Sequence, residues 1–260
     1  YRYLAASSAS VEAGRADVDL STSGGLRDHP VLAEGFVTAA QPAARALLLV
    51  ARIAATRFWT PPNLVAAAIA AADPVVTASD EALRFEAFSP CGGVYARFDL
   101  DRDALDGTIH SHGTTNVDVN PPLKAALARI GARDPLRLRV GPDDLTVTTL
   151  DGQVVEKQVP LPDRWVRGFA ETSVALAPLE PRFDLGPAGL RRFLETVPTT
   201  SARGTNWVVP SGSSARLSGR ATAGAVAAGG IDRLRPLRDL APFVGSLTAA
   251  GAAAGSTGST

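Results

Sequence analysis

The sequence predicts an α+β protein in which a mostly antiparallel sheet packs on several helices, followed by a smaller C-terminal α/β segment. Three observations predict this class. Apolar residues recur at helical spacing over 41–58, the pattern changes to a period of two from residue 83, and short turn sequences separate the alternating segments. Short turns indicate antiparallel neighbours, because parallel strands need a long crossover connection.

The first helix is expected at 41–58. Leu47, Val50 and Ala54 lie on one helical stripe, and the neighbouring leucines widen that stripe, so this helix should be central to the core. A second helix is expected at 62–72, after "TPPN", where its many alanines would permit close packing.

The strands follow. "LRFEAF" and "VYARFDL" alternate on either side of "SPCGG", which predicts a hairpin over 83–100. Residues 108–119 predict another strand, and 121–130 a helix. "LRLRV", "LTVTTL" and "QVVEKQV" predict a three-stranded meander over 136–159, with "GPDD" and "LDGQ" as its turns. A further helix is expected at 162–176.

These elements divide the chain into three predicted parts. Residues 1–176 form the α+β core domain, and 177–245 form a smaller segment of helices and a hairpin. Residues 246–260 are rich in Gly, Ala, Ser and Thr, a low-complexity composition that predicts a flexible tail or linker.

The charge balance excludes a strong global field. Lys+Arg and Asp+Glu are both 26, so nothing in the total charge draws the chain to nucleic acid or to an anionic membrane. Only Lys124 and Lys157 are lysines, so nearly all positive charge is arginine, whose planar fork suits carboxylate and phosphate groups.

Cysteine content and hydropathy bear on the compartment. A single cysteine excludes an internal disulfide and fits a reducing, cytoplasmic location. The apolar run beginning at Ala46 is cut by Arg52 and Arg57, so no membrane span is expected. The chain begins at Tyr1 and contains no Met, so we expect it to be processed or partial, with any N-terminal signal already removed.

Six motifs occur in a fixed order along the first two thirds of the chain. They are "TSGG" (22–25), "TRFWTPP" (56–62), "LRFEAFSPCGGVYARFD" (83–99), "GTTNVDVNPPLKAALARI", "DPLRLRVGPDDLTVTTLDG" and "VPLPDRWVRGFAE" (159–171). In this order they resemble the N-terminal region of actinobacterial SWIM zinc finger family proteins, over about residues 1–175.

The resemblance implies a partner system rather than a reaction. Such proteins are typically encoded beside MoxR-type AAA+ ATPases and von Willebrand factor A domain proteins. The zinc module that names the family needs a Cys-x-Cys and a Cys-x-His pattern, and this chain has one cysteine. We therefore expect no zinc and no other cofactor. The expected function is a non-enzymatic protein-interaction module or adaptor subunit acting with that ATPase and that A-domain protein.

A polar strand face is the first candidate interaction site. In "GTTNVDVNPP", Thr114, Asn116 and Asp118 alternate with Thr115, Val117 and Val119 and would point to one side of a strand. Asn120 precedes Pro121, a pattern typical of a helix N-cap, so its side-chain oxygen is expected to accept a backbone amide hydrogen bond.

Arginine and aromatic residues form the second candidate site. Arg137 and Arg139 should project from one face of "LRLRV", Arg84 could join them from the hairpin, and Trp59 is available as an anchor. Such a surface would also suit nucleic acid, which is the alternative function. The competing interpretation is a polar outer sheet face neutralised by acidic residues: Glu86, Asp99 and Glu156.

A hydrolase or metal enzyme is the third alternative. His110 and His112 would share one side of a continuous strand, and Cys91 could serve as a nucleophile or a ligand. No third metal ligand stands at a recognisable spacing and no hydrolase signature surrounds Cys91. We therefore assign no catalytic residue, and His110 and His112 remain weak metal candidates.

Overall fold

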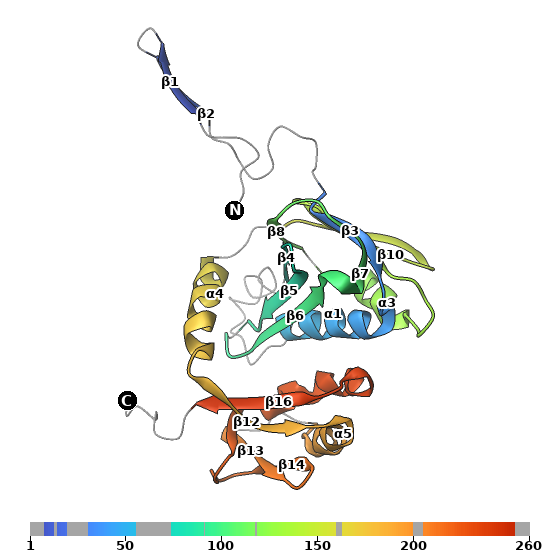
Figure 1. Ribbon diagram of the computed structural model, residues 1–260, viewed down its shortest axis with the longest axis vertical. Helices are drawn as coiled ribbons and strands as arrows, with labels where there is room; N and C mark the ends of the chain where they lie inside the picture. Colours follow the sequence, from blue (N-terminus) through green and yellow to red (C-terminus); the bar gives the residue numbers. More distant parts are fainter. Residues whose placement is uncertain are drawn as a thin grey trace, which may run out of the picture. The chain divides into compact units, whose positions relative to one another are not determined.

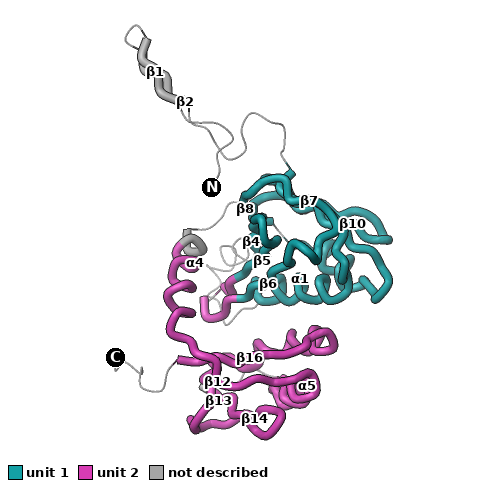
Figure 2. Tube along the Cα trace, in the orientation of Figure 1, with its two compact units in different colours: residues 1–54, 69–87, 96–160 teal, residues 55–68, 88–95, 161–260 magenta. Residues whose placement is uncertain are grey.

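The computed structural model describes residues 8–12, 15–19, 31–55, 74–90, 92–117, 119–159, 163–199 and 205–252 (Figure 1). The chain divides into two compact units (Figure 2). Unit 1 comprises residues 1–54, 69–87 and 96–160, and unit 2 comprises residues 55–68, 88–95 and 161–260. The units alternate along the sequence because the tip of one hairpin, 88–95, belongs to unit 2.

Unit 1 contains the same succession of elements twice: a strand, a helix and three antiparallel strands. The first copy is β3 (Ala33–Val37), α1 (Ala40–Ala55), β4 (Val75–Ala78), β5 (Ala82–Phe88) and β6 (Tyr95–Asp101). The second copy is β8 (Gly113–Asn116), α3 (Pro121–Arg129), β9 (Arg137–Val140), β10 (Asp144–Thr149) and β11 (Gly152–Lys157). Strand β7 (Leu105–Ile109) lies between them in the chain.

The two copies are interlocked. One sheet has the strand order β11-β10-β9-β3-β7 and the other β6-β5-β4-β8. The strand that precedes each helix therefore pairs with the other copy: β3 with β9, and β8 with β4. Neither copy can complete its hydrogen-bond ladder alone, so the two copies should fold as one cooperative body. The sequence contains no recognisable repeat from which this duplicated succession of elements could be predicted.

One apolar core joins both helices to both sheets of unit 1. Ala44 and Leu47 come from α1, Leu127 from α3, Phe85 from the four-stranded sheet and Leu138 from the five-stranded sheet. Each large apolar side chain buried in this way stabilises the fold by about 1.5–3 kcal/mol. The prediction that the first helix is central to the core is confirmed.

A close backbone approach joins β3 to the edge strand β7. Gly35 and Gly107 are register partners. A Cβ atom on Gly107 would lie 2.1 Å from the carbonyl oxygen of Glu34, well inside van der Waals contact. Only glycine fits there, so this pair sets how near β7 can lie to the sheet.

Unit 2 repeats part of the same plan. Its elements are α4 (Asp163–Leu176), β12 (Leu179–Leu185), α5 (Pro187–Thr196), β13 (Thr205–Ser211), β14 (Ser214–Ser218), β15 (Val226–Gly229), the 3₁₀ segments η3 (Ile231–Asp239) and η4 (Ala241–Phe243), and β16 (Leu247–Ala252). Its sheets have the orders β14-β13-β15 and β12-β16. The succession β12, α5, β13, β14 corresponds to the start of each copy in unit 1.

Arginine secures the C-terminal end of α5. Arg238 donates hydrogen bonds from Nε to the carbonyl oxygen of Leu194 (2.9 Å) and from Nη2 to that of Val197 (2.8 Å). Arg235 donates to the carbonyl oxygen of Thr199 (2.7 Å). The carbonyl oxygen of Leu194 also accepts the amide of Val197 at 3.2 Å, and Val197 and Thr199 lie beyond the last residue of α5. The arginines therefore add hydrogen bonds and favourable positive charge at this helix end.

The α+β prediction is confirmed at this level, because helices accompany the sheets and the strand pairs with an assigned register are antiparallel. The strands also include a separate hairpin, β1 (Ser8–Glu12) with β2 (Arg15–Asp19). The predicted meander is present as β9, β10 and β11. The predicted helix at 62–72 lies outside the described residues. In the part of the chain that is described, no helix is both long enough and apolar enough to span a membrane.

Three boundaries differ from the prediction. The single strand expected at 108–119 is two strands in different sheets, β7 and β8, because the chain changes sheets between them. Within the tail expected from 246, residues 247–252 form the strand β16, which pairs with β12. The backbone hydrogen bonds of this pairing order the segment, and composition alone does not predict them. The division expected after 176 lies instead after 160, and α4 belongs to unit 2.

Candidate functional site

The exposed face of the five-stranded sheet carries two of the predicted interaction residues. In β9 the side chains alternate as "LRLRV" predicts: Arg137 and Arg139 point outward, whereas Leu138 and Val140 are fully buried. Strand register places Phe36 opposite Arg137 and Glu34 opposite Arg139. We call this surface the outer sheet face. It comprises Glu34, Phe36, Arg137, Arg139, Thr148 and Val155.

Ion pairs hold the arginines of this face. Arg137 donates from Nη2 to Oε2 of Glu34 at 2.7 Å, and Arg139 donates from Nη1 to Oδ1 of Asp144 at 3.3 Å. Both pairs are partly exposed, so each contributes only about 0–1 kcal/mol to stability. Their main effect is to orient the guanidinium groups on the sheet.

Two apolar side chains lie on the outer sheet face without cover. Phe36 is 49% exposed and Val155 is 43% exposed. The sequence prediction missed both. Phe36 could have been found from "EGFV", since the alternation that buries Val37 forces Phe36 to the opposite side.

On the four-stranded sheet, the predicted residue Arg84 is neutralised. Its Nε donates to Oδ1 of Asp99 at 2.9 Å, and Arg97 bonds to the same carboxylate. The hydrogen bond from Arg97 is the main cause that lowers the pKa of Asp99, and Arg84 lowers it further, while partial burial acts in the opposite direction. Asp99 therefore has the neutralising role that the polar-face interpretation expects.

The polar strand face predicted at 114–118 is not continuous. Thr114 is exposed, and its hydroxyl lies 3.2 Å from that of Thr77. Asn116 is only 5% exposed, so its prediction as a surface residue is wrong. The chain after β11 runs against this end of β8, where the amide of Val159 donates to the carbonyl oxygen of Asn116. Asp118 and Trp59 lie outside the described residues.

The predicted cap is also wrong. Asn120 occupies the N-cap position of α3, but its side chain makes no capping hydrogen bond. Pro121 and Pro122 follow it, and proline has no amide hydrogen to donate. The Nδ2 of Asn120 donates instead to Oε2 of Glu156 at 2.6 Å. Glu156 is 2% exposed, so its predicted role on a polar outer face is wrong too.

The histidines do not share a site. His110 follows β7, and its Nε2 lies 3.6 Å from a carboxylate oxygen of Glu34. His112 precedes β8, and its Nε2 lies 2.7 Å from Oδ1 of Asp80. Across the described ranges, no three His, Cys, Asp or Glu residues gather as a metal would need, and Cys91 lies outside those ranges.

A second candidate surface lies on the two helices of unit 1. We call it the helix face: Arg45 and Arg52 of α1, with Lys124 and Arg129 of α3. Neither helix contains an Asp or a Glu. Arg45 donates from Nη1 to the carbonyl oxygen of Ala128 at 2.8 Å, so α1 lies against the C-terminal end of α3.

Sequence comparison finds no family model and no curated protein that matches this chain. Solved structures do share its fold. The proliferating cell nuclear antigen (PCNA) of Entamoeba histolytica is 10% identical, with a TM-score of 0.50 over 86% of this chain and 90% of that one. A chain of the PCNA2–PCNA3 complex of Sulfolobus tokodaii is 9% identical, with a TM-score of 0.54 over 84% of this chain and 89% of that one. A DNA polymerase sliding clamp of Pseudomonas aeruginosa is 13% identical, with a TM-score of 0.47 over 92% of this chain and 67% of that one. At these identities the likeness to the two PCNA structures concerns the fold alone.

Proposed function

We propose that this chain is a non-enzymatic interaction scaffold whose protein-binding surface is the outer sheet face. The observation that carries the proposal is the exposure of Phe36 and Val155 beside Arg137 and Arg139. Aromatic residues and arginine are enriched where proteins bind one another, and a half-exposed phenylalanine gains free energy when a partner covers it.

The partner system follows from the sequence resemblance. An adaptor that works with a MoxR-type AAA+ ATPase and a von Willebrand factor A domain protein needs a rigid surface rather than a catalytic centre. The five-stranded sheet supplies such a surface, because its inner side is anchored in the core by Leu138, Val140 and Val147. The similar fold of the PCNA2–PCNA3 complex also occurs in a protein assembly.

Affinity purification from the native host tests this proposal. The full chain carrying Phe36→Lys should lose a protein that the unmodified chain retains, because the lysine places a charge at the centre of the contact. Phe243→Lys is the matched control: Phe243 is 41% exposed and belongs to unit 2. Recovery of the unmodified chain alone, or retention of the same protein by the Phe36→Lys chain, would contradict the proposal.

The second candidate function is nucleic-acid binding by the helix face. Its specific support is charge segregation: α1 and α3 carry four basic and no acidic residues, in a chain with 26 of each sign. One of the four, Arg129, forms an exposed ion pair with Asp151 at 3.2 Å, which a phosphate would have to displace. Helices also present side chains from a regular cylinder, so cations one to two turns apart can follow a phosphate backbone.

Electrophoretic mobility shift at two salt concentrations tests the second candidate. If all four cations contact phosphates, binding should weaken about 100-fold between 50 and 200 mM salt. The double variant Lys124→Glu/Arg129→Glu should abolish the shift, whereas Lys157→Glu, an exposed position on β11, should leave it unchanged. No shift at low salt, or equal loss in the control, would exclude the helix face.

A further inference from the structure

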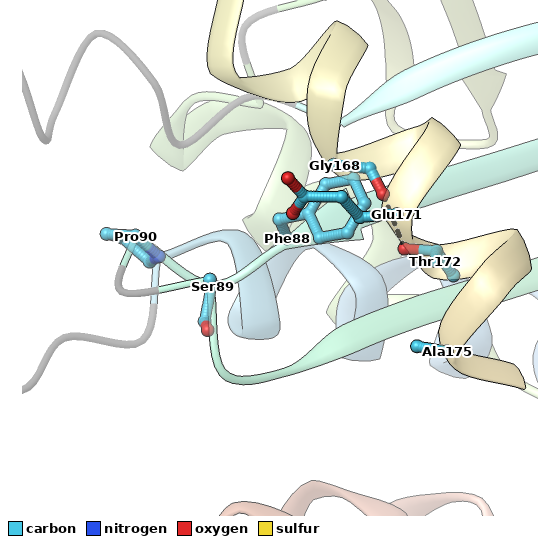
Figure 3. A pocket seen from close by; sticks show the side chains of 8 residues that line it. Phe88, Ser89, Pro90, Gly168, Glu171, Thr172 and Ala175 are labelled. Carbon is cyan, nitrogen blue, oxygen red and sulfur yellow. Dashed lines mark hydrogen bonds between the residues drawn. The ribbon is translucent and has the colours of Figure 1, made fainter. Parts of the chain in front are cut away.

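Unit 2 contains a pocket of about 280 Å³ between the tip of the β5–β6 hairpin and α4 (Figure 3). The tip contributes Phe88, Ser89 and Pro90, and α4 contributes Glu171 and Thr172. None of the described residues that line the pocket belongs to the outer sheet face or to the helix face. What the pocket can bind follows from the groups that its walls offer.

Aromatic packing holds the two walls together. The ring of Phe88 lies 5.1 Å from that of Tyr95 and 5.2 Å, edge to face, from that of Phe169 on α4. Gly168 permits this contact, since a Cβ atom there would lie 3.1 Å from Cζ of Phe88. The pocket therefore has a pre-formed aromatic floor, which reduces the entropy lost when a ligand enters.

The α4 wall offers hydrogen-bond acceptors. The hydroxyl of Thr172 donates its single proton to the carbonyl oxygen of Gly168 at 2.7 Å, drawn as the dashed line in Figure 3. Only the lone pairs of that oxygen remain for a ligand. The carboxylate of Glu171 accepts no hydrogen bond and forms no ion pair with any residue that the structure describes. A ligand at this wall must bring donors and a positive charge.

At the hairpin tip, the hydroxyl oxygen of Ser89 already accepts hydrogen bonds from groups of this chain. The hydroxyl oxygen of Ser89 accepts hydrogen bonds from Nη1 of the buried Arg233 (3.3 Å) and from the amide of Val94 (3.0 Å). Arg233 does not line the pocket. Among the described residues that line the pocket, Glu171 is the one that carries a charge, so α4 forms the cation-binding side.

We propose that this pocket binds the guanidinium group of an arginine side chain presented by a polypeptide partner. A guanidinium carries five donors and stacks on aromatic rings, which matches the acceptors of α4 and the ring of Phe88. A volume of 280 Å³ is below that of most cofactor sites and suits one long side chain. Val174 and Leu176, 74% and 51% exposed on the same helix, can contact apolar residues that flank the arginine.

Amide chemical shifts of this chain test the proposal, with acetyl-arginine-amide as the probe. The amides of Gly168, Glu171 and Thr172 should shift as the probe is titrated and should reach a plateau. Acetyl-citrulline-amide, which has the same shape without the charge, should cause no shift. Glu171→Gln should weaken binding of the arginine probe at least tenfold. Glu195→Gln, an exposed position on α5, should not.

A peptide with leucine on both sides of the arginine distinguishes a polypeptide from a small amine. It should bind at least tenfold more tightly than acetyl-arginine-amide, and this gain should be lost when Val174 and Leu176 are both replaced by Ser. Equal binding of the two arginine probes would overturn the polypeptide assignment. Equal binding of the citrulline probe, or an unaltered affinity in Glu171→Gln, would overturn the site. These outcomes leave the outer sheet face unaffected.

Discussion

The substitution Asn120→Asp separates two roles that the sequence cannot tell apart. If Asn120 capped α3 through its side-chain oxygen, Asp would serve equally well, because both residues are good N-caps and a negative charge suits a helix N-terminus. In the structure Asn120 is a donor to the buried carboxylate of Glu156. Asp removes that donor and places a second negative charge beside the first.

The size of the effect follows from the 2.6 Å contact. Loss of a hydrogen bond to a charged group costs about 1.5–3 kcal/mol, which is the expected effect of Asn120→Ala. Two carboxylates about 4 Å apart repel by about 4 kcal/mol at an effective dielectric constant of 20. Lowering the pH reduces this repulsion, because protonation of either carboxyl removes one of the two charges.

Urea unfolding followed by circular dichroism at pH 7 and pH 5 measures these differences. Asn120→Asp should be less stable than Asn120→Ala at pH 7, and the gap between them should narrow at pH 5. Asn206→Asp, on β13 of unit 2, reports whether an added negative charge destabilises the chain in general. If the Asn120→Asp chain were as stable as the unmodified one at pH 7, the donor role of Asn120 would be refuted. The interpretation of Asn120 as the side-chain N-cap of α3 would then be preferred.

Three further outcomes are expected. Because the pKa of Asp99 is lowered in the folded state, its contribution is present above the ordinary value of about 4 and is lost as the pH falls through the lowered value. Asp99→Asn should therefore lose stability near neutral pH and approach the unmodified chain in acid titrations. Gly107→Ala should destabilise unit 1 by about 1–3 kcal/mol or more through its clash with Glu34, whereas Gly219→Ala, with open space around it, should change urea stability little. Arg238→Ala should speed amide hydrogen exchange at the end of α5, and unchanged exchange there would show that its two carbonyl contacts contribute little.

The predicted candidate sites depended on side-chain direction, and that direction was predictable only where the alternation stayed regular. Arg137 and Arg139 share the outer sheet face because β9 is a regular strand with a buried inner side. Asn116 obeys the same alternation on β8, yet it is buried because a segment some forty residues later lies against it. Alternation determines which side of a sheet a residue occupies. It does not determine what covers that side.

The arginine content illustrates the same limit. The sequence shows that nearly all positive charge is arginine, which suggested a binding surface. In the structure Arg45, Arg235 and Arg238 donate to carbonyl oxygens at helix ends and in loops, and Arg84 binds Asp99. Arginine therefore acts here largely as a structural donor, a role that depends on which backbone carbonyls lie within its reach.

The sequence by itself determined the local elements: helix α1 from its apolar stripe, the meander β9–β11 from its alternation and turns, and the α+β class from both. These features depend on residues close together in the chain, where spacing and turn chemistry act directly. Tertiary structure alone decided that β3 pairs with β9 and β8 with β4, that β7 and β8 belong to different sheets, and that Asn120 meets Glu156. These contacts join residues far apart in sequence, and burying one shared core selects among many pairings that are locally equivalent.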